Sequence, residues 1–185
     1  QVNGRVITYA GSDDGITANH IAQTVANYRS VNPNGQVALI GHSLGGKDVL
    51  TASNILYRNS DVNNKVNLVM TLEAASIDGK GSAFSLGLNE NAQNIINVNS
   101  SKSSMINGGG LTTSSSQNST TINLPLGTDH TNMDNSLAPY IAPILNYMNK
   151  GVNPVNLINN INFNRMQILN NGDLDPNKKK GTSGS

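Results

Sequence analysis

The chain has 185 residues with a net charge of +1, and it contains no cysteine. This length predicts one domain, and the lack of cysteine excludes disulfides, thiolate zinc sites and cysteine nucleophiles. The nearly balanced charge offers no basic face for nucleic acid, and no apolar run is long enough to span a membrane. We expect neither a metal nor a cofactor. The compartment stays open, because a chain without cysteine suits secretion and the cytosol alike.

The first half of the chain alternates two kinds of hydrophobic pattern. Short apolar runs of strand length occupy residues 5–10, 36–40 and 65–72. Between them, apolar residues recur at helical spacing in residues 17–30 and 47–58. Alternating strands and helices are typical of a parallel sheet. The sequence therefore predicts an α/β fold with a mostly parallel sheet flanked by helices.

The second half is less regular. Residues 94–99 and 119–124 have strand patterns, and residues 137–148 have a helical one. Residues 79–93 are expected to form a flap, and the Ser- and Gly-rich residues 100–118 a mobile loop. These elements complete the sheet and close it with a last helix.

Two regions are expected along the chain. Residues 1–150 carry the α/β pattern and are predicted to form the main domain. Residues 151–185 are predicted to be a C-terminal extension, whose Lys-, Gly- and Ser-rich end (177–185) is expected to be disordered.

The most informative motif is Gly-His-Ser-Leu-Gly-Gly at residues 41–46. It contains G-x-S-x-G, follows an apolar strand and precedes a helix, which is the setting of a nucleophile elbow. Such a turn strains the backbone of Ser43, and we expect Gly41 and Gly45 to avoid clashes with it. The N–H of Leu44, at the start of the helix, would stabilise developing negative charge. The motif therefore predicts that Ser43 is a nucleophile at the carboxyl edge of the sheet.

A serine nucleophile needs a base, and the chain offers three histidines. His20 lies on the helix before the motif and is expected at the surface or in packing. His42 lies inside the turn, where we expect a structural role. His130 follows the last predicted strand and comes after Ser43 in chain order, as in proteins with this elbow. It is the candidate base.

An acid is needed to orient and stabilise the imidazole. Glu73 directly follows the strand at 65–72, so it should emerge at the same sheet edge as Ser43. Asp78 lies a little further along the same loop and is the alternative. Asp129 and Asp134 are too close to His130 in sequence for easy triad geometry. The residues alone leave the choice between Glu73 and Asp78 open.

These segments together resemble the α/β-hydrolase fold lipases and esterases. The resemblance is carried by GHSLGG after the strand at 36–40, by LVMTLE at 68–73, and by Asp-His-Thr at 129–131 before the helix at 137–148. It implies hydrolysis of an ester or lipid through an acyl-serine intermediate. Ser43 would attack, His130 would carry the proton, and Glu73 or Asp78 would orient the histidine.

The resemblance also raises a question about the second oxyanion donor, which a loop after an earlier strand usually supplies. Residues 5–10 correspond best to the strand just before the elbow strand. The expectation is then that earlier strands precede Gln1 in a longer polypeptide, which leaves an exposed edge on the first strand. The alternative is a compact variant in which Gly11, Ser12 and Asp13 form that loop.

Two other functions fit part of the pattern. Residues 41–47 also match G-x-x-x-x-G-K, a phosphate-binding loop, although Asp48 replaces the Ser or Thr that would hold Mg²⁺. Alternatively, the same fold serves as an interaction module without catalysis. Serine-directed labelling separates both from a hydrolase.

Overall fold

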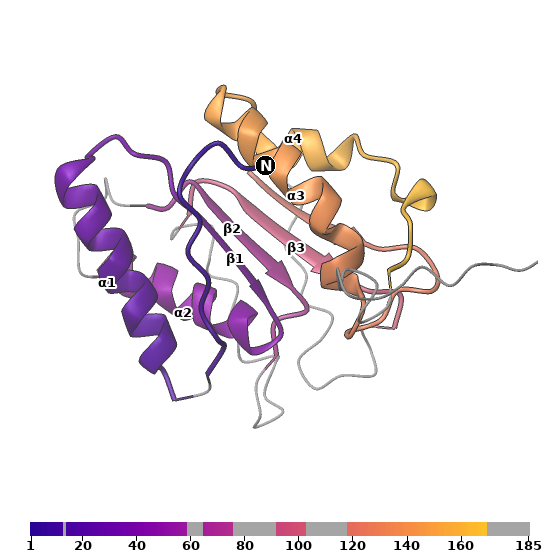
Figure 1. Cartoon of the computed structure of the whole chain (residues 1–185), viewed down its shortest axis with the longest axis horizontal. Coiled ribbons are helices and arrows are strands. Elements are labelled where there is room, and N and C mark those ends of the chain that lie inside the picture. Colours follow the sequence, from indigo (N-terminus) through magenta and orange to yellow (C-terminus); the bar gives the residue numbers. More distant parts are fainter. Residues whose placement is uncertain (13, 59–64, 76–91, 103–117, 170–185) are drawn as a thin grey trace, which may run out of the picture.

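The computed structural model describes residues 1–12, 14–58, 65–75, 92–102 and 118–169 of the chain. Helices lie on both faces of a small twisted sheet (Figure 1). The predicted flap lies outside the described residues except for its last two positions, and so does nearly all of the predicted mobile loop. The expected disordered end also lies outside them.

The sheet has four strands in the order β1-β2-β3-β4, and every neighbouring pair is parallel. The strands are β1 (Ala38–His42), β2 (Leu68–Leu72), β3 (Ile95–Asn99) and β4 (Ser119–Asn123). Four of the five predicted strands are thereby confirmed, each shifted or shortened by a few residues. Because all four strands point the same way, the segments that follow them meet at one edge of the sheet.

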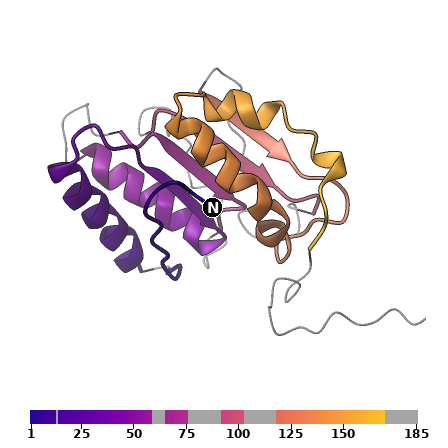
Figure 2. The same cartoon turned by 45° about the horizontal axis from the view of Figure 1, so that its top comes forward.

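Two helix pairs cover the two faces of the sheet (Figures 1 and 2). Helices α1 (Ile16–Val31) and α2 (Leu44–Arg58) pack against one face, in a buried cluster that includes Leu50 of α2 and Val69 of β2. On the other face lies α3 (Met133–Asn149), whose Leu137 shares a second buried cluster with Met70 and Ile96. All three long predicted helices are present. This layering is the expected α/β architecture.

Residues 5–10 do not form the predicted strand. Their apolar side chains remain in water: Val6 is 65% exposed, Ile7 43% and Tyr9 40%. The segment begins beside α3, where the Asn3 backbone N–H donates to the Asn146 side chain, and it runs past β1 toward α1 (Figure 1). A strand pattern alone does not form a strand, because sheet formation depends on a partner that buries one face.

The stretch after α3 packs against the rest of the fold. Helix α4 (Pro154–Asn159) begins with proline, and the Asn153 side chain accepts the N–H of Val155 as its cap. Val155 and Ile158 are fully buried in the cluster around α3, and a short 3₁₀ turn, η5 (Phe163–Arg165), follows. The predicted boundary at residue 150 stays a prediction. No helix within the described ranges is long and apolar enough to cross a membrane.

Candidate active site

Ser43 alone makes the turn between β1 and α2. The strand ends at His42, the helix begins at Leu44, and Ser43 has a left-handed backbone with φ of 55°. This conformation is costly for a residue with a side chain and persists only where the surroundings enforce it. Here the Ser43 N–H donates to the Leu72 carbonyl (3.0 Å), and the Ser43 carbonyl accepts the N–H of Ala75 (2.9 Å). The end of β2 thus holds the turn on both sides.

Two glycines are required by the tightness of this turn. A Cβ on Gly41 would lie 2.1 Å from the carbonyl oxygen of Gly45, and one on Gly46 would lie 2.7 Å from Cβ of Ala74. The expectation that Gly45 avoids a clash is wrong: a Cβ there meets no atom of another segment within 4 Å. Gly45 is already inside α2 and faces open space, whereas Gly46 faces the end of β2.

Ser43, His130 and Glu73 form one hydrogen-bonded series. Nε2 of His130 lies 2.8 Å from Oγ of Ser43, and Nδ1 lies 2.9 Å from Oε2 of Glu73. Since the carboxylate only accepts, Nδ1 carries the proton, which leaves Nε2 free to accept from the serine. The structure therefore brings together the predicted nucleophile, the predicted base and one of the two predicted acids. The other, Asp78, lies outside the described residues.

Glu73 is buried, with only 1% of its surface exposed, and its backbone is also left-handed (φ 44°). Besides His130, it accepts two hydrogen bonds from Ser100, which follows β3. The Ser100 N–H lies 2.7 Å and its Oγ 2.5 Å from Oε1 of Glu73. A buried carboxylate needs such donors. Sequence reasoning missed Ser100, although its place just after a strand could have indicated it, since it emerges at the same sheet edge.

The loop that carries His130 is held by its own side chains. Oδ1 of Asp129 accepts the backbone N–H groups of Thr131 (2.8 Å) and Asn132 (3.1 Å), while Oδ1 of Asn132 accepts the Asp129 N–H (2.9 Å). The Thr131 hydroxyl also donates to Asp129 and is the main cause that lowers the pKa of this carboxyl. Asp129 thus shapes the loop through these hydrogen bonds, and it makes no described hydrogen bond to the His130 ring.

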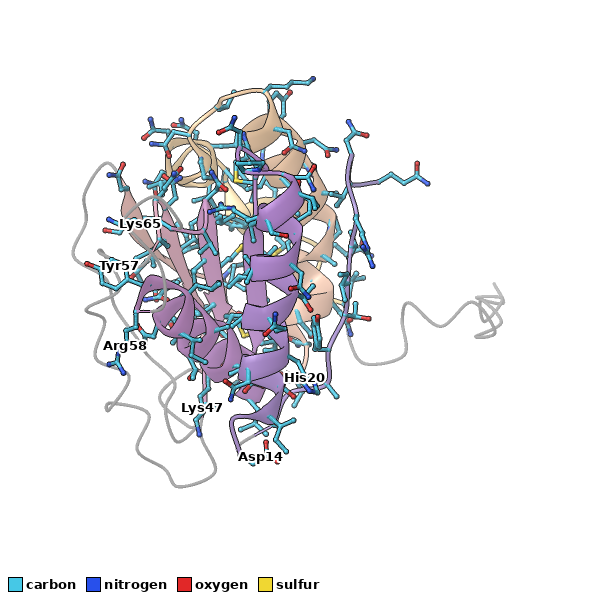
Figure 3. The ribbon with its side chains drawn as sticks, turned by 90° about the vertical axis from the view of Figure 1, so that its left-hand side faces the viewer. Asp14, His20, Lys47, Tyr57, Arg58 and Lys65 are labelled. Atoms are coloured by element: carbon cyan, nitrogen blue, oxygen red, sulfur yellow. The ribbon has the colours of Figure 1, made fainter. Side chains whose placement is uncertain are left out.

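The other two histidines lie in different surroundings. His20 is exposed on α1 (Figure 3). His42 lies beside His130, with 4.7 Å between ring centroids, and its Nε2 is 2.7 Å from the backbone carbonyl oxygen of His130. Nδ1 of His42 is 3.8 Å from the carboxylate of Asp134. Burial is the main cause that lowers the pKa of His42.

The N-terminal segment reaches the elbow at Gly11. A Cβ on Gly11 would lie 2.8 Å from the backbone nitrogen of Gly45 and 3.1 Å from Cβ of Leu44. The next residue, Ser12, donates its N–H to the buried Asp48 of α2 (2.8 Å). Backbone from this segment therefore lies against the residues that would form the oxyanion pocket. Both expectations for the second oxyanion donor stay predictions.

The arrangement places a serine, an imidazole and a carboxylate in hydrogen-bond contact at one edge of the sheet. Within the described ranges, no cluster of His, Asp and Glu side chains is placed to hold a metal ion. The serine and the carboxylate directly follow β1 and β2, and the histidine lies in the loop after β4; the parallel sheet brings these three segments to one edge. Comparisons with protein-family models, with curated proteins and with solved structures find no match to this chain.

Proposed function

We propose that this protein is a serine hydrolase of the α/β-hydrolase type that cleaves carboxylic esters through an acyl-serine intermediate. One observation carries the proposal: Oγ of a serine in a strained turn lies 2.8 Å from an imidazole whose other nitrogen lies 2.9 Å from a buried carboxylate. A histidine that accepts the serine proton, held in one tautomer by an acid, is what activates a hydroxyl.

In the first half of the reaction, Oγ of Ser43 attacks the ester carbonyl while Nε2 of His130 takes the hydroxyl proton. The tetrahedral intermediate collapses, the alkoxide leaves, and His130 returns the proton to it. Water then attacks the acyl-serine with the same proton transfers, which releases the acid and restores Ser43. Glu73 holds the imidazole and stabilises its charged form through both stages.

The developing oxyanion would face the start of α2. The first N–H groups of a helix have no partner within the helix, and its dipole favours negative charge there. Leu44, directly after the serine, is the proposed first donor. Gly11 approaches Leu44 and Gly45 closely, so the N-terminal segment covers this side of the proposed oxyanion pocket.

Labelling with a fluorophosphonate probe tests the proposal. In this reaction Oγ displaces fluoride from phosphorus, so it needs an activated serine but no particular ester. We expect an adduct on Ser43, located by peptide mass spectrometry, that is absent in Ser43→Ala and lost in His130→Ala. Ser30→Ala is the matched control, because it removes an exposed hydroxyl from α1 that donates a hydrogen bond to the Asn27 carbonyl in the same helix (2.7 Å).

The two alternative functions predict other outcomes. An interaction module without catalysis predicts no adduct on any variant. A phosphate-binding loop predicts no adduct but nucleotide binding that depends on magnesium. The second is disfavoured by the tightness of the turn: β1 ends at His42 and α2 begins at Leu44, so Ser43 alone lies between them and no loop is left that could wrap a phosphate.

The ester itself would be identified by a panel of p-nitrophenyl esters of increasing acyl length. Hydrolysis by wild type but not by Ser43→Ala would support the proposal, and the preferred length would separate short soluble esters from lipids. Labelled protein that hydrolyses none of the panel would overturn the ester assignment while leaving the activated serine in place.

A further inference from the structure

We propose that His42, the residue before the nucleophile, is a positioning residue that holds the backbone of the base. This inference rests on the proposed function, because it assigns His42 to the same site. It starts from an interaction that orientation of the imidazole by Glu73 does not explain. Nε2 of His42 lies 2.7 Å from the backbone carbonyl oxygen of His130. A carbonyl only accepts, so Nε2 of His42 is the donor.

The hydrogen bonds from Ser43 and Glu73 reach His130 only through its imidazole. The hydrogen bond from His42 reaches the backbone of His130 instead. His42 is the last residue of β1, and His130 lies in the loop before α3. The imidazole of His130 is held by Ser43 and Glu73. It keeps this position only while the backbone that carries it is also fixed. The hydrogen bond from His42 fixes that backbone to β1, the strand that Ser43 directly follows.

The rest of the loop is anchored elsewhere. Asp129 and Asn132 bind each other and their neighbours within the loop. Thr128 is held by Ser101, whose hydroxyl donates to the Thr128 carbonyl (2.6 Å) and whose N–H donates to the Thr128 hydroxyl (2.9 Å). These bonds set the loop relative to β3 and to itself. The bond from His42 ties the loop to the end of β1, directly before the elbow.

Tautomer and charge fit this role. Burial lowers the pKa of His42, so the ring is neutral near pH 7, and one proton on Nε2 is enough for the donor. A neutral ring beside His130, 4.7 Å away between centroids, also avoids a second positive charge when His130 takes the serine proton. Nδ1 at 3.8 Å from Asp134 is too far for a hydrogen bond, so the donor function rests on Nε2 alone.

A pair of substitutions tests the donor directly. His42→Gln keeps an amide nitrogen the same number of bonds from Cβ as Nε2, and His42→Leu keeps bulk without a donor. We expect the maximal rate of fluorophosphonate labelling to fall about tenfold in His42→Leu, because the barrier rises by roughly the worth of the hydrogen bond that positions the base. The probe concentration at half-maximal rate should be unchanged, and His42→Gln should lie within about threefold of wild type. His20→Leu is the control for loss of a histidine.

Equal rates in His42→Leu and wild type would overturn the inference, and so would a rate in His42→Gln as low as in His42→Leu. If His42→Leu fails to fold by circular dichroism, His42→Asn replaces it, because its amide is too short to reach the carbonyl. Labelling of wild type separates the two proposals: no adduct in wild type overturns the proposed function together with this inference, whereas a labelled wild type with unaffected variants overturns the inference alone.

Discussion

Two segments approach the backbone of Gly45 in the elbow, one at its carbonyl group and the other at its nitrogen, and the structure holds them in different ways. Gly41 of β1 and Gly11 of the N-terminal segment both come so close to Gly45 that a Cβ on either would overlap its backbone, at 2.1 Å and 2.8 Å. Gly41 lies in a buried sheet that cannot move away. Gly11 lies in a segment whose residues are exposed from Asn3 to Gly11. The comparison teaches that the ends of the strands carry the residues of the proposed site, while the N-terminal segment covers one side of that site.

The largest effect on activity should come from Glu73, the proposed acid, which directly follows β2. Glu73→Gln keeps the size of the side chain but offers an amide, which no longer requires a proton on Nδ1 of His130 and stabilises no imidazolium. We expect fluorophosphonate labelling and ester hydrolysis to fall by about 10³–10⁴. Kinetics of both reactions measure this. A fall of less than tenfold would show that another group, with Asp78 the first candidate, supplies the acid.

Gly41→Ala should be the most damaging change to stability. The added methyl would overlap the Gly45 carbonyl, and neither the strand nor the helix can yield without loss of packing, so we expect a loss of about 3 kcal/mol or more in the free energy of unfolding. Urea denaturation measures it. Gly45→Ala is the matched control: with open space at Cβ, it should be neutral or stabilise α2 by up to about 1 kcal/mol. Equal losses in both would contradict this account of the turn.

Ser100→Ala should have a moderate effect. It removes the hydroxyl that donates to Oε1 of Glu73 at 2.5 Å but leaves the Ser100 N–H in place. A lost hydrogen bond to a buried charged group costs about 1.5–3 kcal/mol, so we expect a drop of roughly tenfold to a hundredfold in labelling, with a smaller loss of stability. Ser101→Ala, which changes a bond to the His130 loop but none to Glu73, is the comparison. A rate for Ser100→Ala equal to that of wild type would mean that the backbone donor suffices.

The smallest effect should come from the N-terminal segment. In Gly11→Ala the exposed segment can shift away from Gly45, so we expect the free energy of unfolding to change by less than about 0.5 kcal/mol. Labelling should fall only a few-fold as the side of the site opens. Thr8→Ala, at an exposed position in the same segment, is the control and should change neither. A loss of stability in Gly11→Ala as large as in Gly41→Ala would show that the N-terminal segment is held as rigidly as the sheet.

Much of the fold and of the site could be predicted from the sequence. Buried parallel strands are apolar on both faces, so β2 and β3 were visible as short apolar runs between helical patterns. Ser43 was visible because a tight strand-to-helix turn requires glycines at fixed spacing, and Glu73 because the ends of parallel strands share an edge.

What the sequence could not supply depends on contacts between distant segments. Residues 5–10 have the composition of a strand, but they would pair only with a neighbouring strand whose contact also buries one of their faces. Ser100 and Gly46 owe their roles to Glu73 and Ala74, which lie far from them in the sequence but next to them at the sheet edge. The expected clash at Gly45 was wrong because α2 has already begun at this residue. The helix directs a Cβ on Gly45 away from the other segments.

The central claim is that Ser43 is activated by His130, and the most direct test is the second-order rate of fluorophosphonate labelling of wild type, Ser43→Ala and His130→Ala. The account predicts one adduct per chain in wild type, located on Ser43, none at that site in Ser43→Ala, and a rate in His130→Ala lower by about 10³-fold or more. An adduct that persists in Ser43→Ala at the wild-type rate, or a wild type that the probe does not modify, would contradict it.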